Sequence, residues 1–203
     1  MRLPDPFTDS TWPGITSCLI SDNTTYQQEE LSDNTVIQVS TGAQFYSVAL
    51  EYTDLLVDEY DKVMNFFAKV KSTNSYIEVM LPQLQNLGFS LNSYLVDNGL
   101  KGNQLVLSGI TNVTGSLKLN QYIQLSGHPK LYQVIDYNYN SVSNKVTLGV
   151  YPDLFITTNN TTVNFATPIF RGRFKNINGI EGSALTTEGY YNSIAFDLRE
   201  CVA

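Results

Sequence analysis

The sequence contains few side chains whose type and spacing could support catalysis or metal binding. Its single histidine, His128, stands in the turn-like segment SGHPK, and a histidine acts as base or ligand only with partners within hydrogen-bond reach. No cysteine or second histidine stands at ligand spacing, so we expect His128 to be a surface turn residue and the chain to bind no zinc. Glu29-Glu30 and Val57–Asp61 offer oxygen ligands for calcium, but neither has the Asp-x-Asp-x-Asp-Gly loop pattern.

Carboxylate pairs and tyrosines are the other groups with potential chemistry. The chain has 19 acidic residues, and two of them could cleave a glycosidic bond only at a separation that the fold would have to set. Tyr137, Tyr139 and Tyr151 are glycan-stacking candidates, although tyrosine is also common on any β-protein surface or oligomer interface. No Gly-rich phosphate loop and no G-x-S-x-G motif is present. We therefore predict no catalytic, cofactor-binding or metal-binding residues and no enzymatic activity.

The amino-acid composition of the chain limits which kinds of molecule it can bind. The 203 residues carry a net charge of −7, which argues against tightly bound DNA or RNA because such binding needs clustered lysine and arginine. No apolar run approaches the ~18–20 residues that span a bilayer, so we expect no membrane insertion and no export signal. Cys18 and Cys201 are expected to be two buried thiols and not a disulfide.

One helix and many short strands would have to position any site. The segment Leu50–Ser72 repeats apolar residues at the i, i+3, i+4, i+7 spacing of one buried stripe, which predicts a helix covering one face of a β-sheet. The stripe consists of Leu56, Tyr60, Val63, Met64, Phe67 and Val70. Phe66 lies at its border, and the ring of Phe66 either widens the core contact or faces a neighbouring subunit.

The strand pattern predicts a mainly β protein of the α+β class. A hairpin is expected from Thr35–Ser40 and Gln44–Tyr52 around a turn at Thr41-Gly42, preceded by a polar loop or long hairpin tip. Short strands with turn signals every ~10–14 residues between Gln104 and Phe165 are typical of a small antiparallel barrel or sandwich. The predicted architecture is a β-sandwich or split barrel carrying the helix, with a small antiparallel β-domain inserted into it.

Three regions follow from this pattern. Residues 1–14 contain Pro4, Pro6 and Pro13 and are expected to form an extended N-terminal arm, in which Trp12 anchors to its own core or to another subunit. Residues 15–100 and 168–203 are expected to form the sandwich with the helix, which is the candidate ring-forming belt domain described below. Residues 101–167 are expected to form the inserted β-domain.

Several segments occur in an order that is similar to one protein family. A hairpin is followed by LEYTDLLVDEYDKVMNFFAKVKS and a short strand, and LNQYIQLSGHPKLYQVIDY resembles the family strand pair G-D-x-I-x-x-x-G-x-x-x-x-Y-x-V. Leu119-Asn120 stands in place of Gly-Asp, so the turn there is expected to differ. The segments VTLGVYPDL, PIFRGRFK and YYNSIAFDLRE follow in the same order. From Ile15 to Glu200 the chain resembles tail proteins of tailed bacteriophages, of the distal-tail type.

This resemblance implies a structural virion component of the phage tail, made in the host cytoplasm. Such proteins form a homo-oligomeric ring, usually of six copies, that joins the tail tube to the baseplate or tip. The implied partners are other copies, the tail tube and the baseplate or hub proteins, while DNA passes through without specific binding. Acidic or neutral residues are then expected to line the channel, and Trp12 and Phe66 are subunit-interface candidates. The alternative is a carbohydrate-binding module of a tail tip or cell-surface protein, with Tyr137, Tyr139 and Tyr151 gripping glycans.

Overall fold

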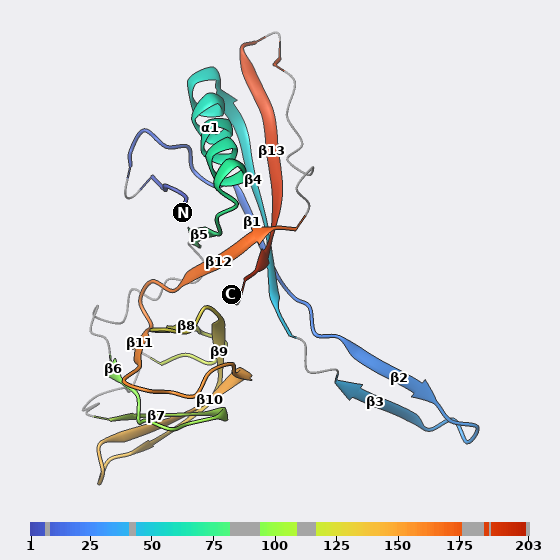
Figure 1. The fold of residues 1–203 in the computed structure, drawn as a ribbon, viewed down its shortest axis with the longest axis vertical. Coiled ribbons are helices and arrows are strands. Elements are labelled where there is room, and N and C mark those ends of the chain that lie inside the picture. The colour runs from blue at the N-terminus through green and yellow to red at the C-terminus, as the bar shows by residue number, and fades with distance from the viewer. Residues whose placement is uncertain are drawn as a thin grey trace. The chain divides into compact units, whose positions relative to one another are not determined.

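The computed structural model describes residues 1–6, 9–40, 44–81, 94–108, 117–175, 185–186 and 188–201. Within these residues the protein is mainly β with one helix, which confirms the predicted fold class (Figure 1). The chain divides into two compact units, which are described separately. The sheet-and-helix unit consists of Pro4–Ser75 and Gly172–Glu200, and the barrel unit of Met1–Leu3, Tyr76–Arg171 and Cys201–Ala203.

The first strands and the helix belong to the sheet-and-helix unit. They are β1 (Ser17–Asp22), β2 (Tyr26–Glu30), β3 (Val36–Ser40), β4 (Tyr46–Leu56) and α1 (Val57–Thr73), with β13 (Tyr190–Glu200) near the C-terminus. The barrel unit contains β5 (Ile77–Met80), β6 (Tyr94–Leu95), β7 (Gly102–Ser108), β8 (Tyr122–Leu125), β9 (Leu131–Asn140), β10 (Lys145–Leu154) and β11 (Thr162–Asn164). The chain passes from one unit to the other along β12 (Ile169–Phe174).

Strand β4 is the central strand of the first unit. It pairs antiparallel with β1 on one side and β13 on the other, so Leu50 lies opposite both Cys18 and Phe196. The full sheet order is β1-β4-β13-β12-β5. Tyr46, Val48, Leu50 and Tyr52 alternate along β4 and are all buried, as the period-two pattern of the sequence predicts. These side chains belong to the buried face of the sheet, and α1 packs on the same face of β4 and β13.

The predicted helix is confirmed, but it begins later than its apolar pattern suggests. Leu50–Leu56 belongs to β4, and α1 starts at Val57, where the Glu59 carboxylate accepts a hydrogen bond from the Leu56 N–H at 2.9 Å. The helix ends at Thr73, and Asn74 caps it in the left-handed conformation with a φ of 47°. The buried helix residues are Val63, Phe66, Phe67 and Val70, whereas Leu56 is exposed.

Strand β3 has a different partner from the one predicted. It pairs with β2, from Val36 opposite Glu30 to Ser40 opposite Tyr26, and not with β4. The predicted turn at Thr41-Gly42 lies outside the described residues. The prediction was wrong because β4 pairs instead with β1 and with β13, strands that are distant in sequence. The polar segment expected to be a loop or hairpin tip therefore supplies β2.

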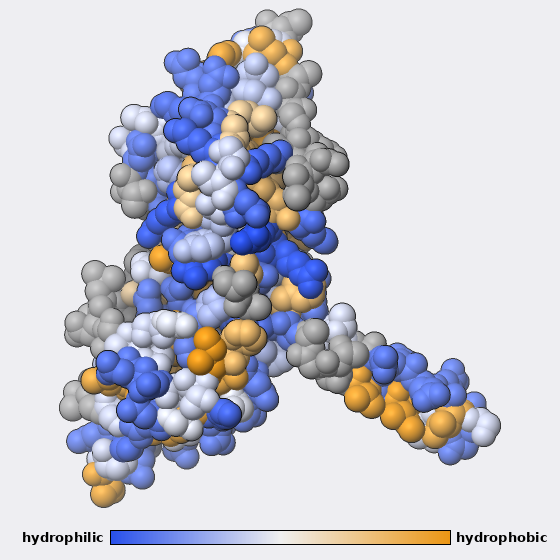
Figure 2. All heavy atoms as spheres, viewed as in Figure 1, coloured by the Kyte–Doolittle hydropathy of each residue, from blue (hydrophilic) through white to orange (hydrophobic). Residues whose placement is uncertain are grey.

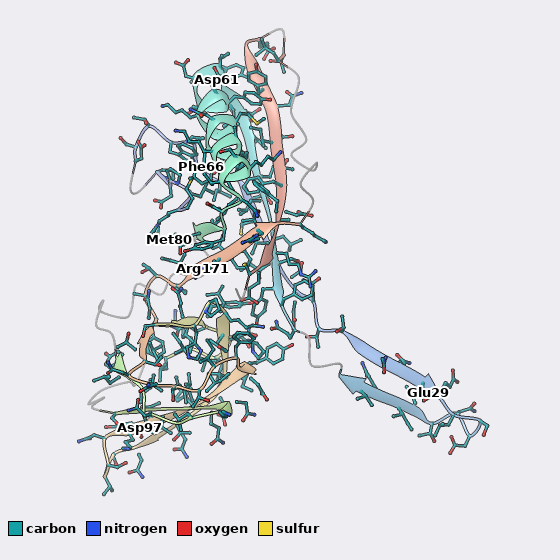
Figure 3. The ribbon with its side chains drawn as sticks, in the orientation of Figure 1. Glu29, Asp61, Phe66, Met80, Asp97 and Arg171 are labelled. Atoms are coloured by element: carbon teal, nitrogen blue, oxygen red, sulfur yellow. The ribbon has the colours of Figure 1, made fainter. Side chains whose placement is uncertain are left out.

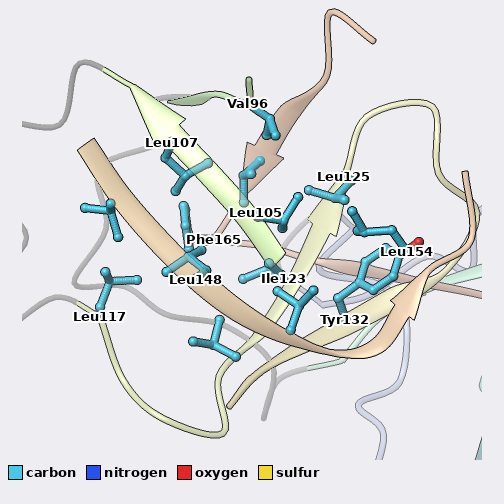
Figure 4. Packing of buried hydrophobic residues seen from close by; sticks show 14 of the residues in the cluster. Val96, Leu105, Leu107, Leu117, Ile123, Leu125, Tyr132, Leu148, Leu154 and Phe165 are labelled. Carbon is cyan, nitrogen blue, oxygen red and sulfur yellow. The ribbon is translucent and has the colours of Figure 1, made fainter. Parts of the chain in front are cut away.

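The barrel unit is a sheet that closes on itself. Its strand order is β6-β11-β8-β9-β10-β7, and the two edges meet where Val96 bridges Leu107 and the Asp97 N–H donates to the Val106 carbonyl at 2.9 Å. These contacts join the two edge strands, and joining edges in this way is how small β-domains limit edge pairing. Leucine, valine and isoleucine side chains with Tyr132 and Phe165 fill the interior (Figure 4). The predicted small antiparallel β-domain is thus a barrel.

The N-terminal residues are part of the fold of the barrel unit. Met1–Leu3 runs parallel to β5, with the Leu3 N–H donating to the Glu78 carbonyl at 2.8 Å and the Glu78 N–H donating to the Met1 carbonyl at 2.9 Å. Leu3 is fully buried. The sheet-and-helix unit ends at Ser75, and the barrel unit continues from Tyr76. The predicted limits of an arm at 1–14 and an inserted domain at 101–167 stay predictions.

Candidate assembly surfaces

His128 is a buried structural residue and not the surface turn residue that we expected. His128 is only 6% exposed, and its Nδ1 hydrogen-bonds the buried Tyr132 hydroxyl at 3.0 Å. That hydroxyl in turn accepts the Phe155 N–H at 3.1 Å. Burial lowers the pKa of the imidazole below its ordinary value of 6.5. His128 therefore ties the β8–β9 turn to the strand β9 as a neutral group.

A cavity of about 540 Å³ lies beside His128, and the polar side chains that line it are already engaged. The Ser126 hydroxyl accepts the Thr162 N–H at 2.8 Å, and the Gln124 amide oxygen accepts the Ile169 N–H at 3.1 Å. The Asn164 amide bonds the backbone of Ala166 and Thr167. Arg171 donates to Glu78 at 2.9 Å and stacks on the Tyr76 ring at 4.2 Å. These bonds hold the loops in place and assemble no catalytic set.

The buried imidazole predicts an acid-sensitive barrel unit. Because the folded state disfavours protonated His128, stability is complete above the ordinary pKa of 6.5 and falls as the pH drops below it. We expect the urea midpoint of the wild-type protein to decrease between pH 7.5 and pH 5.5. His128→Gln keeps a polar side chain without a titrating group, so its midpoint should change less over the same interval. Equal slopes for the two proteins would show that His128 does not carry the effect.

The acidic residues considered as cation ligands do not gather around a site. Glu29 and Glu30 lie on β2, and Val57–Asp61 forms the first turn of α1 (Figure 3). Among the described residues, no three side chains of histidine, cysteine, aspartate or glutamate are grouped closely enough to hold a metal ion. Cys18 and Cys201 are not joined in a disulfide, and both are half-buried.

The two interface candidates, Trp12 and Phe66, meet inside their own subunit. The Trp12 ring packs edge-on against Phe66 at 6.0 Å, and its Nε1–H donates to the Tyr52 hydroxyl at 3.3 Å. Burial raises the pKa of that hydroxyl to about 12, so Tyr52 stays neutral and able to accept. Trp12 is 9% and Phe66 8% exposed. Their contact with a neighbouring subunit stays a prediction, and only a small part of either ring is free for it.

The three tyrosines considered for glycan stacking do not share one face of the barrel sheet. Tyr137 and Tyr139 lie opposite Leu148 and Val146 on the face that carries the core, and Tyr139 packs against that core. Tyr151 lies opposite Gln133 and follows the buried Val150, which places it on the other face. The three rings therefore form no common platform, and stacking on a glycan by any one of them stays a prediction.

The β2–β3 hairpin is an apolar surface that sequence reasoning did not identify. Every side chain described from Gln27 to Val39 is exposed. Ile37 and Val39, which lie on one face of β3, are 44% and 57% exposed, and hydrophobic side chains gather along this hairpin (Figure 2). The β-branched residues of β3 are the sequence signal for this strand, and the same pattern also fits pairing with β4.

The open face of the β1–β4–β13 sheet is the second such surface. It is the face opposite α1, and it carries mostly small or neutral side chains, namely Ser17, Leu19, Ser21, Ser47, Ala49, Glu51, Thr53, Ser193, Ala195, Asp197 and Arg199. The guanidinium of Arg199, the one cation in this set, lies 3.8 Å from the centre of the Phe45 ring. The face is consequently smooth and slightly acidic, with no cluster of cations.

None of the described helical residues forms a segment of the length and hydrophobicity required to cross a bilayer. The sequence matches two family models, described as the N-terminal part of the A domain of distal tail protein pb9, over residues 3–84, and as the B domain of the same protein, over residues 87–172. It is also 35% identical over 208 residues to distal tail protein pb9 of Escherichia phage T5, a match that covers 98% of this chain and 99% of the relative. The chain therefore belongs to the pb9 family of bacteriophage distal tail proteins, which are structural components of the virion and not enzymes.

Proposed function

We propose that identical copies of this protein, six in number, close into a ring that joins the phage tail tube to the baseplate or tip and lets DNA pass through its centre. The sheet-and-helix unit forms the ring, and the barrel unit is carried by it as the inserted domain. The partners are neighbouring copies, the tail tube and the baseplate or hub proteins. The observation that carries this proposal is the exposed apolar hairpin β2–β3.

An isolated two-stranded hairpin is at best marginally stable in water. Here β2 and β3 form a sheet of their own, and the described part of the chain adds no further strand to it. Its Ile37 and Val39 side chains remain in solvent within the subunit. A neighbouring copy that covered this face would remove both side chains from water and stabilise the strand pair. Because the covered and covering surfaces differ, such a contact is heterologous and can close into a ring.

The open face of the β1–β4–β13 sheet has the properties that the channel wall requires. A wall rich in lysine and arginine would neutralise phosphates and hold the DNA. Glu51 and Asp197 instead give this face a slight negative charge, while Ser47, Ala49 and Ala195 give it a smooth surface. We assign this face to the channel, in agreement with the acidic or neutral lining expected from the sequence.

Cryo-electron microscopy of tails purified from particles that contain this protein tests the proposal. The expected result is one ring of six copies between the tube and the baseplate or tip, with the Ala49 and Ala195 face turned to the channel. A single copy per tail, or a channel lined by the lysine and arginine side chains of this chain, would contradict it.

A further inference from the structure

One end of the sheet-and-helix unit carries an apolar tip. Strand β4 ends here and β13 begins, with Leu56 opposite Tyr190. Helix α1 begins with Val57, and Leu185 bridges Tyr191. Leu56, Val57, Leu185 and Tyr190 are between 42% and 54% exposed, and hydrophobic atoms gather at this end in Figure 2. A cluster of large exposed apolar side chains on a small unit commonly marks a site of protein association.

Acidic side chains surround this tip. Asp54, Asp58, Asp61 and Glu188 are all exposed, and the Glu59 carboxylate is bonded to the Leu56 N–H. Acids at a helix N-terminus are ordinary complements of the helix dipole. That explanation covers Asp58 and Glu59, but it does not account for the exposed Leu56, Leu185 and Tyr190 beside them.

The opposite end of α1 carries a small groove that is lined by both apolar and positively charged side chains, and it is therefore complementary to the apolar, acid-surrounded tip. Its volume is about 170 Å³, and it is lined by Val70, Lys71, Asn74, Ser75, Arg173 and Phe174. Lys71 lies 5.9 Å from the Phe174 ring, and Lys69 and Lys175 are further exposed cations on the same segments. A cavity of about 150 Å³ is enough to hold a benzene ring. The groove thus has room for one aromatic side chain between two cations.

We propose that the apolar tip of one copy docks into the basic groove of the next copy, with the Tyr190 ring seated between Lys71 and Arg173. The apolar side chains of the tip would contact Val70 and Phe174 of the groove, and the acids around the tip would face the cations around the groove. The Tyr190 ring would lie between the two cations of the groove. The inference rests on the proposed ring and names the surfaces that join its subunits in addition to the hairpin.

The placement of the two surfaces explains why such a contact would run head to tail. Tip and groove lie at opposite ends of the 17-residue helix, about 25 Å apart at 1.5 Å per residue. A contact between different surfaces of identical chains is heterologous, and an open row of copies then has one free tip at one end and one free groove at the other until the ring closes.

Charge reversal tests the contact in tails assembled from plasmid-supplied protein. Lys71→Glu with Arg173→Glu reverses the groove, and Asp58→Lys with Glu188→Lys reverses the tip. Each pair alone should lower incorporation into tails by about tenfold or more, since like charges then face each other. Lys101→Glu with Lys118→Glu removes two exposed cations of the barrel unit and is the matched control. The two defective variant proteins should assemble again when they are supplied together. The reversed tip of one variant then meets the reversed groove of the other, and each unchanged tip meets an unchanged groove.

Cysteine cross-linking tests the same contact without reversing any charge, so it applies even if the charge-reversed variants fail to fold. Tyr190→Cys with Ser75→Cys should give disulfide-linked copies in oxidised tails, up to the full ring. Tyr190→Cys with Ser143→Cys, whose second site is in the barrel unit, should give no such ladder. Tails without a ring of copies would overturn the proposed function together with this contact. Tails with a ring but without the Tyr190–Ser75 ladder, or with unchanged assembly of folded charge-reversed protein, would overturn the contact alone.

Discussion

Val63→Asp should leave the sheet-and-helix unit unfolded. Val63 is fully buried on the face of α1 that packs against β4 and β13. An uncompensated buried charge costs about 3–5 kcal/mol, against a total stability of about 5–15 kcal/mol for a whole domain. Circular dichroism should show loss of the helix signal, and thermal unfolding should lose the transition of this unit.

Two variants separate this effect from loss of packing and from added charge. Val63→Ala removes two methyl groups and should cost about 2 kcal/mol, leaving a folded protein with a lower melting temperature. Asn65→Asp places the same acid on the exposed side of the helix and should stay within about 0.5 kcal/mol of the wild type. If Val63→Asp melted like Asn65→Asp, α1 would not seal the sheet in solution.

Ile37→Glu with Val39→Glu should abolish assembly while leaving the subunit folded. Both side chains are exposed on one face of β3, so their replacement should change the stability of the free subunit by about 0.5 kcal/mol or less. In the proposed ring the same positions are covered by a neighbour, where an unpaired charge costs about 3–5 kcal/mol. Since 1.4 kcal/mol is a factor of ten, the association constant should fall by about a hundredfold or more.

Incorporation of this variant into purified tails, measured beside its melting temperature, checks the prediction. Gln28→Glu with Gln38→Glu is the matched control, because it adds two acids to the other face of the same hairpin and removes no apolar side chain. The control should assemble close to the wild-type level. Normal incorporation of the Ile37 and Val39 variant would show that the hairpin is not a subunit contact.

Local patterns in the sequence were sufficient to predict the elements themselves. The apolar spacing from Val63 to Val70 predicted the helix, and the alternation of Tyr46, Val48, Leu50 and Tyr52 predicted a strand with one buried face. The regular turn signals between Gln104 and Phe165 predicted a small β-domain. These features depend on residues three or four apart in a helix, or two apart in a strand, and a sequence displays such neighbours directly.

The partners of these elements were decided only by tertiary structure. β4 pairs with β13, which begins more than a hundred residues later, and this pairing displaced the predicted hairpin with β3. His128 is buried beside Tyr132, whose hydroxyl it hydrogen-bonds, and Trp12 meets Phe66 across 54 positions of sequence, as the two residue numbers show. The tip and groove at the two ends of α1 likewise combine segments that are distant in the chain.

The sequence by itself determined a mainly β chain with one amphipathic helix and segments in the order of a phage distal tail protein. The tertiary structure decided which strands pair, which polar residues are buried and which apolar side chains are left in solvent. The physical reason is that periodicity is a property of neighbours along the chain. Burial and exposure depend instead on which distant segments remove a side chain from water, so the surfaces available to another copy became visible only in the folded subunit.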